Sequence, residues 1–121
     1  MSRQRMDQGG RRRLPIGERL WETVREVLTD HSIILPNGRR QPMEFTPPAE
    51  DLMRGFIEGG VRELHSRGSL EPEIVIAENN IRKFTDDMAG EAERQGANEI
   101  DEIIFSRASS WWCPKNLWPF C

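Results

Sequence analysis

Residues that commonly carry out catalysis or bind metals are scarce in this sequence. Its 121 residues include two histidines, His31 and His65, and two cysteines, Cys113 and Cys121. There is no Gly-x-Ser-x-Gly nucleophile elbow, no Gly-x-x-x-x-Gly-Lys phosphate loop and no His-Glu-x-x-His zinc motif. Each histidine lies near the end of an expected helix, where an imidazolium would interact favourably with the helix dipole. The sequence therefore predicts a protein that is not an enzyme and has no cofactor.

The two cysteines do not have the spacing of a metal site. Cys113 and Cys121 are eight positions apart, whereas zinc-binding cysteine pairs are usually separated by about two to four residues. We therefore predict no metal site. The two thiols could form a disulfide or be modified by an enzyme, and the sequence leaves their redox state open.

Long apolar runs are also missing. No stretch approaches the roughly eighteen apolar residues that a transmembrane helix needs, and no apolar segment follows the basic N-terminus as it would in a secretory signal. We therefore expect a cytoplasmic protein without a transmembrane segment. With 36% hydrophobic and 31% charged residues, the chain favours one small helical domain over a buried parallel sheet.

Positive charge is concentrated at the N-terminus. Residues 1–13 contain one acid, Asp7, and five arginines: Arg3, Arg5, Arg11, Arg12 and Arg13. This segment has no hydrophobic period, so we expect residues 1–14 to form a disordered basic arm that makes secondary electrostatic contacts. Such an arm could bind nucleic acid without sequence preference. Because the chain carries a net charge of −3, nucleic acid is the minor expectation.

Apolar residues spaced three and four apart predict a mainly α, four-helix domain over residues 15–109. The first helix, roughly 16–29, is expected to place Arg19 on its polar face and to bury Ile16, Leu20, Val24, Val27 and Leu28. The dipeptide Asn37-Gly38 is typical of tight hairpin turns. We therefore expect a short β-hairpin or an extended loop between the first two helices.

The second helix is expected to begin after a capping Thr46 and to end at Gly68. Its expected apolar stripe consists of Leu52, Phe56, Ile57, Val61 and Leu64. Gly55 and Gly59 are one turn apart and carry no side chains. This spacing favours a close crossing with another helix.

The third helix is expected between Ser69 and Gly96, with an apolar stripe at Ile74, Ala77, Ile81, Phe84, Met88 and Ala92. This coiled-coil-like stripe makes self-association through the third helix an option. Asp86 and Asp87 are assigned to its solvated face. Asn98 is expected to cap a short fourth helix that buries Ile100, Ile103, Ile104 and Ala108.

Residues 110–121 form an aromatic tail that holds three of the four tryptophans and both cysteines. Pro114 and Pro119 disfavour a helix there and lower the entropy lost on binding. Large aromatic side chains are typical binding anchors, so the candidate partner-binding residues are Trp111, Trp112, Leu117, Trp118 and Phe120. The sequence thus favours a non-enzymatic interaction or assembly subunit that docks onto another protein chain through this tail and amphipathic helix faces.

Three other interpretations of the tail stay open. It could fold back and cover a small helical core, which would require no partner. It could also insert at a membrane interface. Finally, a helical domain followed by a compact Trp/Cys segment is similar in layout to precursor peptides that have a leader and an enzyme-modified core, with Cys113 and Cys121 as modification sites.

Overall fold

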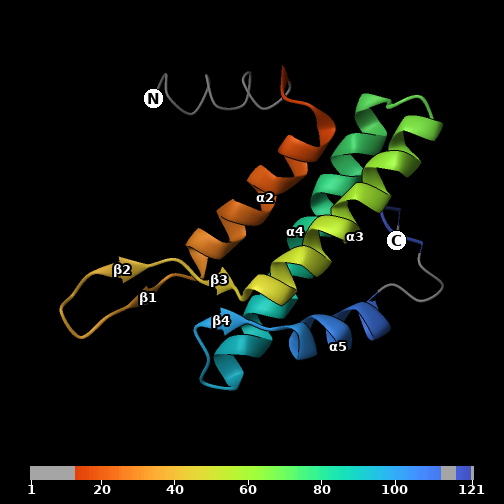
Figure 1. The fold of residues 1–121 in the computed structure, drawn as a ribbon. Helices are drawn as coiled ribbons and strands as arrows, with labels where there is room; N and C mark the ends of the chain where they lie inside the picture. Colours follow the sequence, from red (N-terminus) through yellow and green to blue (C-terminus); the bar gives the residue numbers. More distant parts are fainter. Residues whose placement is uncertain (1–12, 113–116, 121) are drawn as a thin grey trace.

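The computed structural model describes residues 13–112 and 117–120, apart from the side chains of Trp111 and Trp112. Within these ranges the chain forms four helices: α2 (Ile16–Asp30), α3 (Pro47–Ser66), α4 (Glu71–Arg94) and α5 (Glu102–Trp112) (Figure 1). The mainly α fold is therefore confirmed. The expected basic arm falls almost entirely on residues 1–12, which lie outside the described residues, and its last arginine, Arg13, is exposed.

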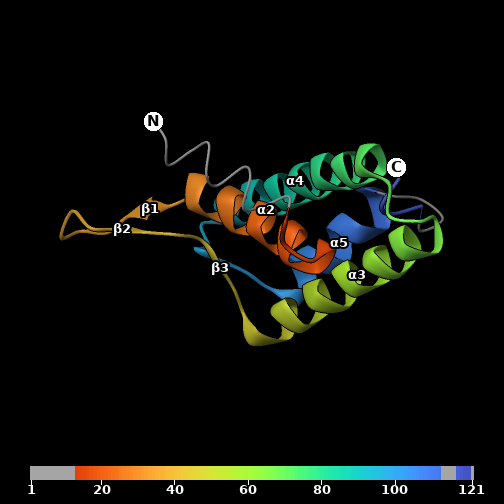
Figure 2. The same ribbon diagram turned by 90° about the horizontal axis from the view of Figure 1, so that it is seen from above.

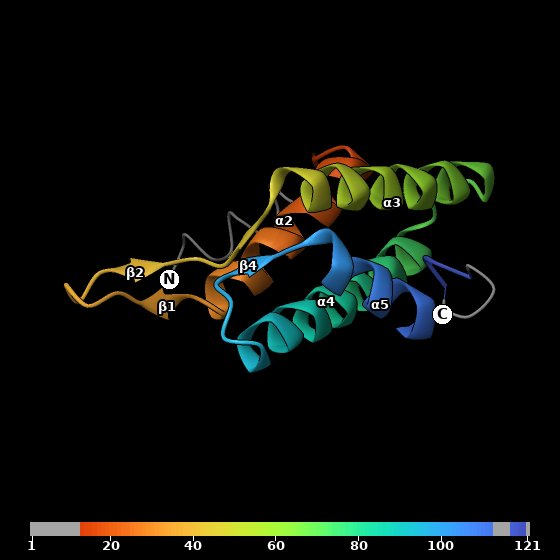
Figure 3. The same ribbon diagram turned by 60° about the horizontal axis from the view of Figure 1, so that its bottom comes forward.

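The segment between α2 and α3 forms the expected hairpin. β1 (Ile33–Ile34) pairs antiparallel with β2 (Arg40–Gln41). Gly38 has a φ of +82°, a conformation that glycine adopts without strain, and its amide donates to the Leu35 carbonyl at 2.8 Å. The hairpin projects away from the helices at the end of α2 (Figures 1 and 3).

A second strand pair was missed by the sequence analysis. β3 (Glu44–Phe45) pairs in parallel with β4 (Glu99–Ile100) and joins the start of α3 to the start of α5. The expected cap at Asn98 is wrong, because Asp101 has this role: its Oδ1 accepts the amides of Ile103 and Ile104 at 2.9 Å. Thr46 is the N-cap residue of α3 as expected, but its hydroxyl makes no capping bond and instead donates to the Ile100 carbonyl at 3.4 Å.

The core lies among all four helices, and α2 and α5 lie on opposite sides of the α3–α4 pair (Figures 1 and 2). The whole predicted stripe of α4 is buried in it. This stripe is therefore enclosed within one chain and offers no face for the suggested self-association. Two other assignments are corrected: Leu52 is 42% exposed and Ile103 is 63% exposed, because each lies at the outer edge of its helix.

Arg19 lies inside the molecule and not on the polar face of α2. It is 4% exposed, and its guanidinium contacts Glu71 and Glu78 of α4, each at 2.8 Å. The hydrogen bond to Glu71, followed by that to Glu78, outweighs the effect of burial and raises the pKa of Arg19. The guanidinium fork can bond two carboxylates at once, so this charged residue is accommodated where α2 meets α4.

None of the helices in the described part of the chain combines the length and the apolar character needed to cross a membrane.

Candidate functional site

Residues 117–120, called the tail segment below, pack against α3 and α4. The indole of Trp118 stacks on the ring of Phe56, with 4.6 Å between centroids and 18° between planes. Its Nε1–H donates to the Phe56 carbonyl at 2.8 Å. Trp118 is thus held by both an apolar and a polar contact with α3.

Gly60 makes this contact sterically feasible. A Cβ atom on Gly60 would lie 2.5 Å from Nε1 of Trp118 and 2.6 Å from two ring carbons, which is closer than non-bonded atoms approach. No other helix of the described residues crosses α3 at Gly55 or Gly59, so the predicted close crossing is not made within the chain. A Cβ on Gly55 would meet no other atom within 4 Å, and one on Gly59 would meet only the Arg62 side chain.

The rest of the tail segment is held by further contacts. Asn80 of α4 donates to the Pro119 carbonyl at 2.6 Å, and the Arg67 guanidinium lies 4.2 Å from the ring centroid of Phe120. Leu117 remains 57% exposed. Two of the predicted anchors, Trp118 and Phe120, therefore cover the domain's own core in this structure.

The remaining candidate residues of the tail fall outside what the structure describes. The side chains of Trp111 and Trp112, like Cys113 and Cys121, lie outside the described residues. Arg3, Arg5, Arg11 and Arg12 do so as well. Their predicted roles in partner binding, modification and electrostatic contact stay predictions.

An open groove lies between α3, α5 and Trp118, and we call it the tail groove. Its volume is about 630 Å³. Aromatic rings of Phe56, Phe105 and Trp118 line it, together with Leu52, Gly55, Gly59, Glu63, Ser109 and Ser110. Phe56 and Phe105 are in edge-to-face contact at 6.0 Å. The groove therefore combines aromatic surface with polar groups from Glu63, Ser109 and Ser110, a mixture that ligand-binding sites commonly show.

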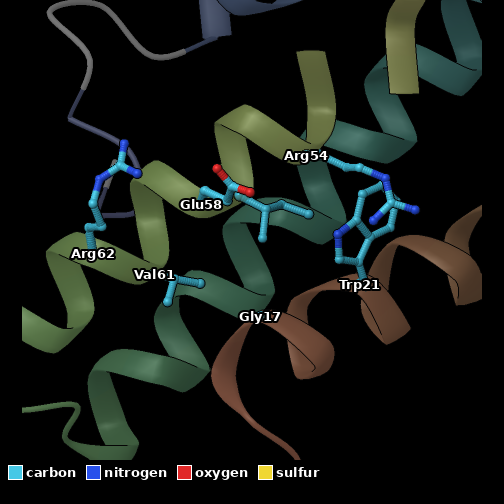
Figure 4. A pocket seen from close by; sticks show the side chains of 7 residues that line it. Gly17, Trp21, Arg54, Glu58, Val61 and Arg62 are labelled. Atoms are coloured by element: carbon cyan, nitrogen blue, oxygen red, sulfur yellow. The ribbon is translucent and has the colours of Figure 1, made fainter. Parts of the chain in front are cut away.

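A smaller hollow of about 310 Å³ lies between α2 and α3 (Figure 4). The Arg54 guanidinium lies over the Trp21 indole, 4.8 Å from the ring centroid. Glu58 and Arg62 follow along α3, so charges of alternating sign border this hollow. Neighbouring opposite charges offset one another, so the border has no marked preference for an anionic or a cationic ligand.

His31 has partners that the sequence analysis did not identify. Its Nε2 lies 2.7 Å from Asp86 Oδ1 and its Nδ1 lies 2.5 Å from Glu93 Oε1. Burial favours the neutral ring, but hydrogen bonds to both carboxylates and their negative charges outweigh this effect and raise the pKa of His31. Asp86 is therefore not simply part of a solvated face. The other histidine, His65, contacts Ser69 at 3.1 Å.

Over the ranges that the structure describes, no group of three or more His, Cys, Asp or Glu side chains is arranged to hold a metal ion. No protein-family model, no curated protein and no solved structure matches this chain.

Proposed function

We propose that the protein is a non-enzymatic interaction subunit that binds an amphipathic helix of another protein chain in the tail groove. The observation that carries the proposal is the open, aromatic-lined groove formed where Trp118 of the tail segment meets α3 and α5. This proposal keeps the tail as part of the docking surface. It assigns Trp118 to the groove lining and not to a free peptide.

The shape of the groove supports a helical ligand. On α3 the lining residues run from Leu52 to Glu63, which corresponds to about 16 Å, or three helical turns. Gly55 and Gly59 face this surface without side chains, so the backbone of a partner helix can approach closely. Amphipathic helices commonly bind in apolar grooves of this kind by residues spaced three and four apart.

The chemistry of the lining indicates which face of the partner would be bound. The half-buried Phe56 and Trp118 offer aromatic surface for large apolar side chains, with the buried Phe105 beneath, and Leu52 extends this surface at one end. Glu63 lies at the other end of the lined stretch of α3, where it is 47% exposed and already paired with Arg67 at 3.1 Å. A helix with an apolar stripe would complement this aromatic surface.

The test fills the groove without disturbing the fold. Gly55→Trp places a large side chain where the structure leaves open space. A photo-reactive amino acid at Leu52, introduced in the protein's own cells, would identify the partner by cross-linking and mass spectrometry. Calorimetry with the purified partner should then show binding to the unmodified protein and at least tenfold weaker binding to Gly55→Trp.

Gly90→Trp is the matched control, because Gly90 lies in α4 outside the tail groove. This variant should bind like the unmodified protein. Equal affinity of all three proteins, or cross-links that are equally frequent from Leu52 and from the remote exposed Ile34, would disprove docking in the groove.

A further inference from the structure

His31 lies where three parts of the fold meet. It follows the last residue of α2 directly, and its ring reaches Asp86 and Glu93 of α4. The next residue, Ser32, accepts a hydrogen bond from Arg40 of β2 at 3.1 Å. The His31 ring therefore connects α4 to the base of the β1–β2 hairpin.

We propose that His31 is a pH-sensitive clasp that fixes the base of this hairpin to α4. The clasp is closed while the imidazole carries two protons and opens when it has lost one. The reason is the geometry of the two contacts, since each ring nitrogen faces a carboxylate oxygen. A neutral imidazole has one N–H donor and one lone pair, so it can satisfy only one of the two carboxylates and directs its lone pair at the other.

Other charged groups around the ring do not replace this interaction. Asp30 precedes His31 and lines a hollow on α4 together with Asp86, Arg82 and Lys83. Arg82 is paired with Glu26 of α2 at 3.1 Å, and Arg40 of the hairpin contacts Ser32. The direct contacts of the ring are with the two carboxylates, and these favour its doubly protonated form.

The direction of the pH effect follows from these contacts. The pKa of His31 is higher in the folded protein than its usual value, which is about 6.5 in an unfolded chain. The clasp therefore contributes fully to stability below about pH 6.5 and loses that contribution as pH rises through the folded pKa. The hairpin should be held most tightly in mildly acidic solution.

Nuclear magnetic resonance of the full chain tests the proposal. A titration of both histidine rings should give a midpoint above about 6.5 for His31, with His31→Gln identifying its signal. The double variant D86N/E93Q removes both carboxylates and should lower this midpoint by about one pH unit. The Gly38 and Met43 amides are hydrogen-bonded in the hairpin region. As pH rises through the same transition, their hydrogen-exchange rates in the unmodified protein should increase several-fold more than the rates of the same amides in His31→Gln.

His65→Gln is the matched control, because it removes the other histidine and leaves the clasp intact. It should preserve both the midpoint of His31 and the change in hairpin exchange. A His31 midpoint at or below 6.5, a midpoint unchanged in D86N/E93Q, or hairpin exchange with the same pH dependence in His31→Gln would each overturn the proposal. None of these results bears on helix binding in the tail groove, so the two proposals fail separately.

Discussion

The indole of Trp118 packs directly on Gly60 because this glycine has no Cβ atom at the position that the ring occupies. The same absence gives Trp118 access to the carbonyl of Phe56, one turn earlier in α3. A helical glycine usually lowers stability by about 1 kcal/mol relative to alanine. At this position, packing and a hydrogen bond from the tail offset that cost.

Alanine at two glycines of α3 should therefore have opposite effects. Gly60→Ala should lower the free energy of unfolding by about 1 kcal/mol, because the cost of overpacking, about 1–3 kcal/mol, exceeds the gain in helix propensity. Gly55→Ala should raise it by about 0.5–1 kcal/mol, since its Cβ meets no other atom. Urea denaturation measures both. If Gly60→Ala were as stabilising as Gly55→Ala, the indole would not be seated on α3.

Arg19 and His31 show what a helical period does not reveal at the residue scale. Apolar spacing identifies the buried stripe of α2, but Arg19 beside it is buried because Glu71 and Glu78 lie opposite on α4. Likewise, the partners of His31 are 55 and 62 positions away in the sequence. A dipole argument based on neighbouring residues cannot identify such partners.

Among the elements, the helices could be predicted from local sequence patterns, whereas the pairing of β3 with β4 could not. Each helix has its own apolar period, and α3 and α4 are followed by glycines with positive φ, Gly68 and Gly96. The pairing of β3 with β4 joins two-residue strands that are 55 positions apart. Strands this short carry too little pattern to predict their partner.

Deleting residues 117–121 should lower the free energy of unfolding by about 3 kcal/mol while the helices persist, because two partly buried aromatic side chains lose their contacts. Calorimetry should show a lower melting temperature and circular dichroism a similar helix signal at low temperature. Leu117→Ala is the control: this side chain is 57% exposed, so the melting temperature should hardly change. An unaltered melting temperature after the deletion would show that the tail does not support the core.

At the scale of the whole molecule, all four described helices contribute to one hydrophobic cluster. Its residues extend from Leu20 in α2 to Ala108 in α5, and Trp118 and Phe120 pack against it. A domain with one core usually unfolds in a single cooperative transition. The tail should therefore be part of the same cooperative unit as the helices.

A variant that keeps Trp118 as its only tryptophan, with Trp21, Trp111 and Trp112 replaced by phenylalanine, tests this expectation. In a urea titration, its fluorescence should report the tail segment and its circular dichroism the helices. Both signals should give the same midpoint. A fluorescence transition at clearly lower urea would instead show that the tail detaches before the core unfolds.

The mainly α fold, the hairpin at Asn37-Gly38 and most of the buried residues could be predicted from the sequence, because these features depend on local spacing and turn chemistry. The sequence also identified the tail as aromatic surface that something must cover. The tertiary structure adds that Trp118 and Phe120 pack on their own domain, that Trp118 lines a groove, and that His31 contacts both Asp86 and Glu93 of α4. These features depend on contacts between distant residues, and the local periods of the sequence do not reveal which distant segments meet.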